Sequence, residues 1–203
     1  MLIAIANLKG GVGKTTLAIQ TAAHLEAELF DLDKQGDSTD WAVRFGQFPC
    51  QHIAEADAWV ALSAAREAKD YVVADCPPAE GVPLRSALAL AHLVIIPVLA
   101  SPQDLKAFGR MRVLCDEARK VNPGLVVACV ANNLRTVGMA KDLVDVLSGE
   151  KDVVMLGSVG ARQAIPDAYA AGTPAFIARG EAARELTHVL LGVEKLLRKI
   201  GRR

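Results

Sequence analysis

Two lysines and three glycines lie within six residues near the start of the chain, in the segment "LKGGVGKTT" from Leu8 to Thr16. Glycine lets the backbone approach a ligand closely, and the N–H groups at the start of a helix attract anions. A lysine and a hydroxyl directly after the glycines supply a cation for phosphates and a ligand for Mg²⁺. The segment therefore predicts a loop that binds a nucleoside triphosphate, ATP, together with Mg²⁺.

Each residue of this loop has an expected part in binding. Lys14 is expected to reach the β- and γ-phosphates, Thr15 to ligate Mg²⁺, and Thr16 to contact the region of the α-phosphate. The general P-loop pattern has glycine at the position of Leu8, and this chain has an additional lysine, Lys9, beside it. The backbone that surrounds the phosphates is expected to come from Gly10, Gly11, Val12 and Gly13.

Three carboxylates follow predicted strands and would complete the site. Asp31 and Asp33, in "FDLDKQGDSTDW", end the second predicted strand, where side chains two apart point the same way. Asp75 ends the apolar run "YVVAD" and is expected to hold Mg²⁺, through water. Aspartate is also common in solvated turns, so a purely structural part for the first pair stays open.

The elements that must position these residues alternate between apolar runs and helical patterns. Helices are predicted after the glycine loop, from Ser101 (the N-cap, followed by Pro102) to about Val121, and at 181–200. This order predicts an α/β fold of the P-loop NTPase class, a mostly parallel twisted sheet flanked by helices on both faces, in one domain over residues 1–203. The predicted strands are 2–6, 29–33, 71–75, 92–98, 125–131 and 153–157.

The composition excludes several classes of protein. Hydrophobic residues make up 52% of the 203 residues but aromatic residues only 4%, which favours a core of Ala, Val, Leu and Ile between helices and a parallel sheet. No apolar run reaches the length of a membrane span, and no signal peptide pattern is present, so a cytoplasmic protein is expected. The four cysteines have no C-x-x-C spacing, which argues against a zinc ribbon or a redox pair.

Three segments together resemble the ParA/MinD family of deviant Walker A ATPases. "KGGVGKTT" is similar to the family's Walker A box, "FDLDKQGDSTDW" to its A′ box and "YVVADCPP" to its Walker B strand. The resemblance implies that the chain dimerises on ATP, that Lys9 reaches the partner's ATP, and that Asp33 orients the attacking water. Lys34 replaces the usual proline of the A′ box, and the link "HLEAELFDLD" before it is shorter than in relatives.

The resemblance extends over nearly the whole chain. "LASPQDLKAF" resembles the second switch region, so Asp104 is expected to sense the nucleotide or the partner, although a simple charge at a helix N-terminus explains it equally well. Asn132 and the loop at 162–167 lie where relatives hold adenine. Because the chain starts directly at the first strand, it resembles small ParA-type ATPases that lack an N-terminal DNA-binding domain.

The function implied is a weak ATP hydrolase, stimulated by a ParB-like protein, that binds DNA non-specifically as an ATP dimer. It would help to partition a plasmid, a chromosome or another cargo, and would associate with the nucleoid when bound to ATP. Clustered cations near the C-terminus favour such a polyanion. These cations are Lys195, Arg198, Lys199, Arg202 and Arg203.

Two alternatives stay open. Apolar residues recur at helical spacing in the last helix, and such a face could either enter a lipid interface, as in a MinD-like membrane-cycling ATPase, or dock on the sheet. We favour DNA over a membrane. An adaptor that binds nucleotide without hydrolysing it is the other alternative, because of the shortened link before the second strand. The apolar residues are Val189, Val193, Leu196 and Ile200.

Overall fold

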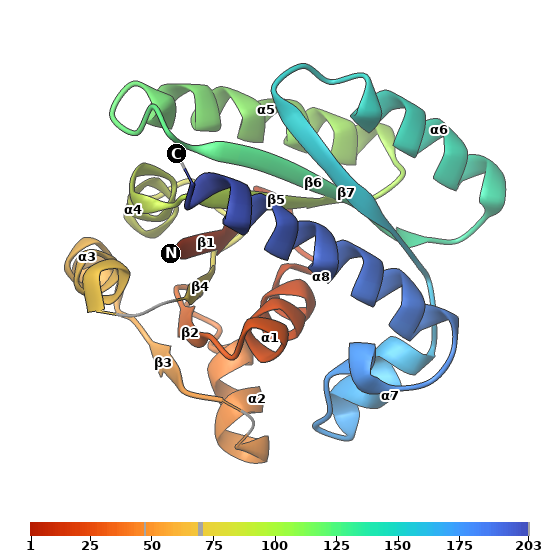
Figure 1. The fold of residues 1–203 in the computed structure, drawn as a ribbon, viewed down its shortest axis with the longest axis horizontal. Helices are drawn as coiled ribbons and strands as arrows, with labels where there is room; N and C mark the ends of the chain where they lie inside the picture. The colour runs from red at the N-terminus through yellow and green to blue at the C-terminus, as the bar shows by residue number, and fades with distance from the viewer. Residues whose placement is uncertain (47, 69–70, 203) are drawn as a thin grey trace.

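The computed structural model describes residues 1–46, 48–68 and 71–202. Within them, seven strands form one sheet in the order β3-β2-β4-β1-β5-β6-β7, and every pair of neighbours is parallel. Figure 1 shows α1 and α8 in front of this sheet. The strands are β1 (Leu2–Ile5), β2 (Glu28–Asp31), β3 (Cys50–His52), β4 (Val72–Asp75), β5 (Leu93–Val98), β6 (Val126–Leu134) and β7 (Val153–Gly160).

Helices connect the strands and cover both faces of the sheet, as the sequence predicts. One apolar cluster joins the sheet to α3, α4, α5 and α6, and a second joins it to α1 and α8. This is the fold class that the sequence predicts. The helices are α1 (Lys14–Leu25), α2 (Asp37–Phe45), α3 (Ala58–Ala68), α4 (Val82–Leu90), α5 (Pro102–Arg119), α6 (Val137–Ser148), α7 (Ala164–Ala170) and α8 (Glu181–Ile200), with short 3-10 turns η1 (Glu55–Asp57) and η2 (Ala175–Ile177).

The central strand β1 explains why both faces must be covered. Its side chains alternate, so that Leu2 and Ala4 enter the cluster of α3 to α6 while Ile3 and Ile5 enter the cluster of α1 and α8. All four are fully buried. Each large aliphatic side chain buried in this way contributes about 1.5–3 kcal/mol to folding. The glycine loop therefore begins directly after the fully buried strand β1, and this strand fixes the position of the loop.

The apolar stripe of α8 docks on the sheet. Val189 and Val193 are fully buried, and Leu196 and Ile200 pack against the same cluster. Gly192 faces Leu156 of β7, where an added Cβ would lie 3.1 Å from the leucine side chain. The helix thus uses its apolar face within the molecule, which is the second of the two uses that the sequence left open.

The observed elements differ from the predicted ones at several boundaries. β2 ends at Asp31, so Asp33 lies in the turn that follows and not in the strand. β2 is nevertheless as long as β1 and pairs with β4 over its whole length, with Asp31 level with Asp75. The short strand β3 was not predicted, because its residues are partly or fully exposed and carry no apolar alternation.

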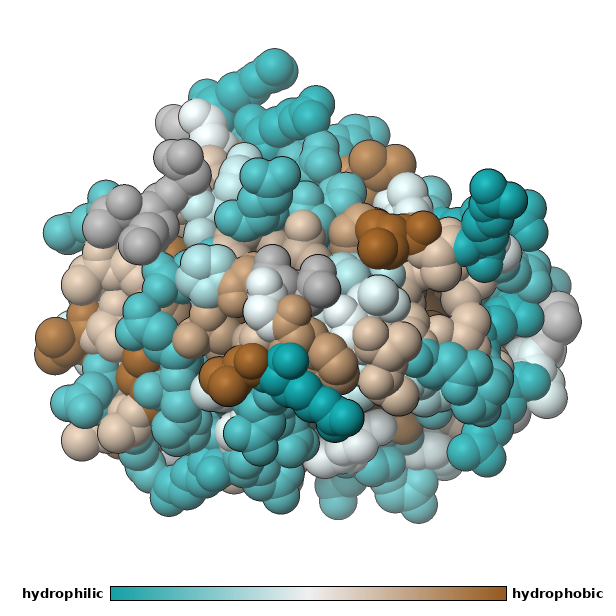
Figure 2. Space-filling view, turned by 90° about the horizontal axis from the view of Figure 1, so that it is seen from below, coloured by the Kyte–Doolittle hydropathy of each residue, from teal (hydrophilic) through white to brown (hydrophobic). Residues whose placement is uncertain are grey.

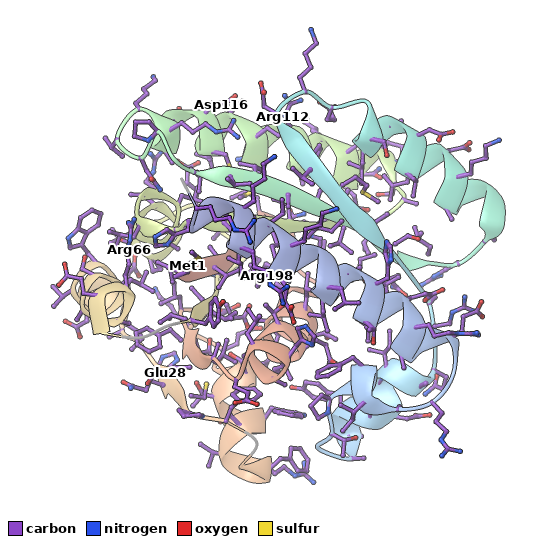
Figure 3. The ribbon with its side chains drawn as sticks, in the orientation of Figure 1. Met1, Glu28, Arg66, Arg112, Asp116 and Arg198 are labelled. Atoms are coloured by element: carbon purple, nitrogen blue, oxygen red, sulfur yellow. The ribbon has the colours of Figure 1, made fainter. Side chains whose placement is uncertain are left out.

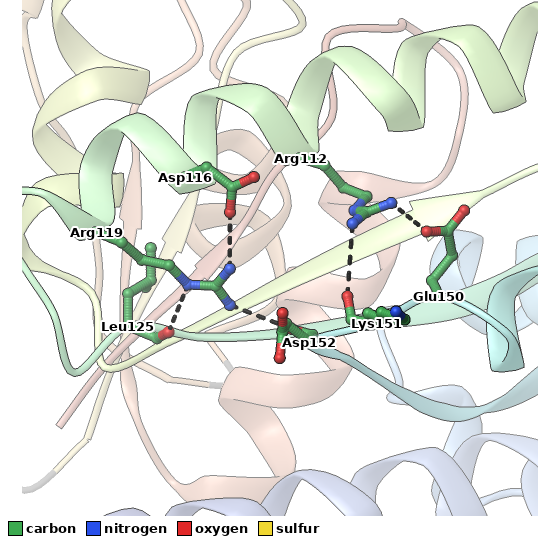
Figure 4. Close-up of polar contacts among 7 residues, drawn as sticks. All are labelled: Arg112, Asp116, Arg119, Leu125, Glu150, Lys151 and Asp152. Atoms are coloured by element: carbon green, nitrogen blue, oxygen red, sulfur yellow. Dashed lines mark hydrogen bonds and ion pairs between the residues drawn. The ribbon is translucent and has the colours of Figure 1, made fainter.

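Polar contacts hold α5 to the amino ends of β6 and β7, at the edge of the sheet opposite the glycine loop. Arg119 donates to the carbonyl oxygens of Leu125 (3.3 Å) and Asp152 (3.2 Å) and pairs with Asp116 (2.8 Å). Arg112 pairs with Glu150 about two turns earlier on the helix than Arg119 (Figure 4). Figure 3 labels Arg112 and Asp116 at the top of the molecule. This network is therefore structural and separate from the predicted site.

An aromatic cluster joins α2 to α7. Trp41 is 3% exposed, and its indole N–H donates to the carbonyl oxygen of Tyr169 at 2.8 Å. The rings of Phe45, Phe48 and Tyr169 lie 5.4–5.9 Å from the Trp41 ring. In a chain with few aromatic residues, this cluster fixes the two short helices against each other.

The surface carries scattered hydrophobic side chains. The face on the side of α2 and α7 has hydrophilic residues mainly around its rim and weakly to strongly hydrophobic residues across its middle (Figure 2). Val43 and Ile177 are among the exposed aliphatic residues. Among the described residues, no helix combines the length and the apolar character that crossing a bilayer requires.

Candidate nucleotide-binding site

The glycine loop connects β1 to α1 and has the backbone geometry of an anion-binding loop. Gly11 and Gly13 have φ angles of 73° and 91°, which residues with a Cβ atom rarely adopt. Gly13 is the N-cap of α1. An added Cβ at Gly13 would lie 2.4 Å from the amide nitrogen of Asn132. No heavy atom lies within 4 Å of the Cβ position of Gly10 or Gly11 among the described residues. The loop is therefore uncrowded at these two glycines.

Lys14 is the first residue of α1 and is 6% exposed. Its ammonium donates to the carbonyl oxygen of Lys9 at 3.1 Å, across the loop. Burial lowers the pKa of Lys14, while the charges of Asp75 and Asp33 act against this shift. This buried ammonium has mainly one carbonyl oxygen as its partner. Charge-assisted hydrogen bonds to phosphate oxygens in the same loop would therefore stabilise it strongly.

Asp75 ends β4 and is 1% exposed. No described residue donates a hydrogen bond of good geometry to either of its carboxylate oxygens. Burial, together with the neighbouring charge of Asp31, raises the pKa of Asp75 to about 7. The hydroxyls of Thr15 and Ser38 and the charge of Lys14 favour the charged form but do not offset the burial. A buried carboxylate without a good partner is what a divalent cation site requires.

We expect Asp75→Asn to raise the free energy of unfolding of the nucleotide-free protein by about 2 kcal/mol at pH 8, because a neutral amide costs less to bury than an unpaired carboxylate. The folded chain binds the Asp75 proton more tightly than the unfolded chain does, since the pKa rises from 3.8 to about 7. Stability should therefore fall as the pH rises through this window. Urea unfolding with EDTA at pH 5 and pH 8 measures both effects, and an unchanged pH dependence in the variant would contradict them.

Asp31 and Asp33 differ in what they contact. Asp31 is fully buried, and its carboxylate accepts hydrogen bonds from the N–H groups of Asp33 and Thr39, both at 3.0 Å, and from the Thr39 hydroxyl at 3.1 Å. It thus ties the start of the turn between β2 and α2 (residues 32–36, called the A′ turn below) to α2. Asp33 is half-buried, and its carboxylate accepts only a 3.2 Å bond from the Gln35 N–H among the described residues. Asp31 therefore has a structural part, and Asp33 is the carboxylate left available for a ligand or a water.

Lys9 is held within its own chain. Its ammonium lies 2.7 Å from a carboxylate oxygen of Asp104, which is buried at the start of α5. Ser101 caps this helix as predicted, accepting from the Asp104 N–H at 3.2 Å. The Lys9 N–H donates to the side chain of Asn7, which in turn donates to the carbonyl oxygen of Pro97 at 2.8 Å. The first lysine of the loop is therefore connected to the carboxyl end of β5 and to α5.

A pocket of about 230 Å³ lies beside the loop and combines the segments expected to hold the base. Asn132 lines it, and its side chain donates to the carbonyl oxygen of Val12 at 2.8 Å. Arg162 also lines it and pairs with Glu185 at 2.8 Å. Asn133, with φ of 52°, is a further lining residue that sequence reasoning missed, as it did Asn7 and Ser38. Only the position of Asn133 beside Asn132 could have pointed to it.

The residues present fit ATP and Mg²⁺. The uncrowded loop and the buried Lys14 suit a triphosphate, and the unsatisfied oxygens of Asp75 suit a hard cation. Among the described residues, no three His, Cys, Asp or Glu side chains could hold a metal by themselves. Thr15 and Asp75 would therefore hold Mg²⁺ together with water and phosphate oxygens, and the ion would neutralise phosphate charge there.

Comparisons with known proteins place the chain among relatives that match most of its length. The chain is 33% identical to the maintenance of carboxysome distribution protein A of Halothiobacillus neapolitanus, over 93% of this chain and 94% of that protein. It is 32% identical to the chromosome-partitioning ATPase Soj of Thermus thermophilus, over 61% of this chain and 65% of Soj.

Solved structures share the fold. The structure of apo McdA from Cyanothece superposes with a TM-score of 0.79 at 16% identity, over 97% of this chain and 98% of that one. A plasmid partition protein of Borrelia burgdorferi B31 bound to AMPPNP gives 0.77 at 20% identity, over 96% and 98%. The model of the CobQ/CobB/MinD/ParA nucleotide binding domain matches residues 3–175. The chain therefore belongs to the CobQ/CobB/MinD/ParA family and is a nucleotide-binding ATPase of the ParA/MinD type.

Proposed function

We propose that this chain, a single domain over residues 1–203, dimerises on ATP, binds DNA non-specifically in that state and distributes a cargo. The observation that carries the proposal is the meeting of three groups at one edge of the sheet. These are the buried cation of Lys14, the unsatisfied carboxylate of Asp75 and the available carboxylate of Asp33, whose charges act on one another. Together they supply what phosphoryl transfer to water requires, which is positioning and charge stabilisation.

Each residue has a proposed role in hydrolysis. Lys14 binds the β- and γ-phosphates, Asp33 orients the attacking water, and Thr16 and Asn132 contact the remaining parts of the nucleotide. Asp31 keeps Asp33 in place through the A′ turn, to which it is hydrogen-bonded. The exposed Lys34 pairs with Glu55 at 3.0 Å, so an ion pair holds this turn where relatives have a proline. The backbone at Gly10, Gly11, Val12 and Gly13 surrounds the phosphates.

Lys9 is proposed to act on the ATP of a second copy. To do so it must leave Asp104, so the ion pair inside one chain competes with the contact between two chains. We expect Lys9→Ala to leave the affinity for ATP within about two-fold and to weaken dimerisation on a non-hydrolysable analogue by ten-fold or more, the loss of about one charge-assisted contact.

Analytical ultracentrifugation with and without the analogue measures this effect. Lys120→Ala is the matched control, because it removes an exposed lysine at the opposite edge of the sheet from the loop. An unaffected dimer in the Lys9 variant would remove the trans role.

The exposed face of α8 supports DNA as the polyanion. Cations recur along one side of the helix, so the basic surface is longer than the C-terminal cluster that the sequence indicates and spans about 22 Å. The acidic residues of α8 are paired, Glu181 and Glu185 with Arg162 and Glu194 with His24 and Arg198. Figure 3 labels Arg198 on this helix. The basic surface consists of the exposed Arg184, Lys195, Arg198, Lys199 and Arg202, with the exposed polar side chain of His188 between Arg184 and Lys195, while Arg203 lies outside the described residues.

Reversing Lys195, Arg198 and Lys199 to glutamate is expected to weaken DNA binding by 100-fold or more and to reduce its salt dependence, because several phosphate contacts are lost. Fluorescence anisotropy with labelled duplexes of unrelated sequence measures both. A matched reversal of Lys106 and Arg110 on α5 and of Lys120 at its C-cap should change little, because α5 covers the opposite face of the sheet. Equal effects of the two variants would mean that another face binds DNA.

The relatives indicate the kind of cargo. One is named for the distribution of carboxysomes and another for the partitioning of chromosomes. We propose the same class of task here, with a ParB-like protein that stimulates hydrolysis and with association to the nucleoid in the ATP state. The docked apolar face of α8 speaks against the MinD-like alternative, since its buried valines would have to leave the core to enter a membrane.

The direct test is DNA binding with ATP, ADP and no nucleotide at about 50 and 200 mM salt. We expect binding only with ATP and a steep loss at the higher salt concentration. Anionic vesicles tested in parallel should not bind the protein. Binding that ignores the nucleotide, or that goes to vesicles alone, would contradict the proposal.

A further inference from the structure

A groove of about 870 Å³ runs between β7 and α8, away from the nucleotide site. Three consecutive residues of β7, Val154 to Leu156, line one side of it. Successive side chains of a strand point to opposite faces, so a groove that borders three in a row follows the edge of the strand. Residues of α8 from His188 onward, and Arg202 after it, form the other side. The groove is therefore a channel along a strand edge.

β7 is the last strand of the sheet. Among the described residues it pairs with β6 alone, along its other edge. The backbone N–H and C=O groups of an edge strand can pair with a further strand, and protein partners commonly add one in this way. Extended backbone is therefore the form of ligand that this side of the groove can bind.

The side chains of the groove select the chemistry of that ligand. Leu191 is 53% exposed and Val154 is 40% exposed, which gives the centre an apolar floor. Lys195, Lys199 and Arg202 surround the floor and are exposed. The one acidic residue in the lining, Glu194, is already paired with His24 at 2.8 Å and with Arg198 at 2.8 Å. A ligand with carboxylates beside a small apolar anchor complements this arrangement.

We propose that the groove between β7 and α8 binds an extended acidic segment of a partner protein, which adds as a strand to β7 and places apolar side chains on Leu191 and Val154. DNA and membranes share the attraction to the cations, but neither supplies backbone N–H and C=O groups for a strand edge. The proposal stands apart from the ATPase site and would hold if the chain did not hydrolyse ATP. Because the same cations serve DNA in the proposed function, the acidic segment and DNA would exclude each other.

The test uses a labelled short peptide of glutamates with two leucines two residues apart at its centre, so that both leucines face the same side of a strand. Its binding to the full chain is measured by fluorescence anisotropy. We expect the peptide to bind, and to lose at least about ten-fold in affinity when both leucines are glutamate or when alternate peptide nitrogens are methylated. Equal binding of either altered peptide would overturn the proposal, because charge alone would then explain it.

Variants of the protein locate the site. Leu191→Gln removes part of the apolar floor without changing the charge. It should lower the affinity for the peptide at least about ten-fold while leaving the affinity for DNA within two-fold. Val60→Gln on α3 replaces another exposed aliphatic residue and is the matched control. Leu191→Gln with unchanged peptide affinity, or vesicles of anionic lipid that bind through Leu191 while the peptide does not bind, would overturn the proposal. With ATP present, unlabelled duplex DNA should displace the peptide, and simultaneous binding of DNA and peptide would also overturn the proposal.

Discussion

Replacing Lys14 by glutamine is expected to lower the affinity for ATP by 100-fold or more. The lysine is buried, its pKa is lowered by burial, and within the chain its ammonium donates to a single carbonyl oxygen, that of Lys9, among the described residues. Phosphate oxygens would supply several charge-assisted hydrogen bonds, and losing them costs about 3 kcal/mol. Isothermal titration calorimetry with ATP and Mg²⁺ measures the loss directly.

Lys120→Gln is the control for this variant. Lys120 is exposed at the C-terminal end of α5, at the opposite edge of the sheet from the loop, and its removal should leave the affinity for ATP unchanged. The thermal unfolding of Lys14→Gln without nucleotide should resemble that of the wild type, since glutamine keeps a donor for the Lys9 carbonyl. ATP affinity that survives in Lys14→Gln would mean that the loop binds something other than a triphosphate.

Replacing Asp33 by alanine is expected to abolish hydrolysis while leaving the binding of ATP and the dimer intact. Asp33 is half-buried in the turn after β2, and its carboxylate is tied only weakly, by a 3.2 Å bond from the Gln35 N–H. Because Asp31 makes the structural contacts of this turn, removing Asp33 should not disturb the turn. A loss of 100-fold or more in kcat with unchanged nucleotide affinity is the expected pattern for a residue that positions the attacking water.

Phosphate release under single-turnover conditions separates hydrolysis from product release. Asp40→Ala, at an exposed position of α2, is the matched control. Asp31→Ala should behave differently from Asp33→Ala, because it leaves the N–H groups of Asp33 and Thr39 without their acceptor and should lower stability as well as activity. Unchanged hydrolysis in Asp33→Ala would remove Asp33 from its proposed role, whereas a wild-type chain that binds ATP but releases no phosphate would leave the nucleotide-binding adaptor as the better account.

The sequence predicts the fold and the glycine loop well, because both depend on local patterns. The apolar runs and the Ser101 cap required only periodicity and capping rules, and the bounds of α8 agree with those predicted. The ends of β2, β6 and β7 were less predictable, since they depend on pairing with neighbouring strands. β3 could not be predicted at all, because an exposed three-residue edge strand exists only through its register with β2.

The contacts within the site lay beyond the reach of the sequence. Asp31 and Asp33 are two residues apart but differ in their contacts, and only the hydrogen bonds of Asp31 to the turn distinguish them. The pairing of Lys9 with Asp104 joins residues 95 positions apart through the parallel order of β1 and β5. The unsatisfied state of Asp75 likewise follows from burial by several elements at once. Residue type and spacing indicate chemistry, whereas partner choice is decided by the tertiary structure.

The contact of Trp41 with Tyr169 gives the molecule its own optical signal. Of the two tryptophans, Trp41 is enclosed between α2 and α7, and Trp59 is 50% exposed on α3. Emission from the enclosed indole should peak at shorter wavelength and resist quenching by iodide, whereas the exposed indole should be quenched readily. α2 follows the A′ turn, and α7 follows the loop beside the base pocket. Any relative shift of these two helices should therefore change the emission wavelength of Trp41, without an added dye.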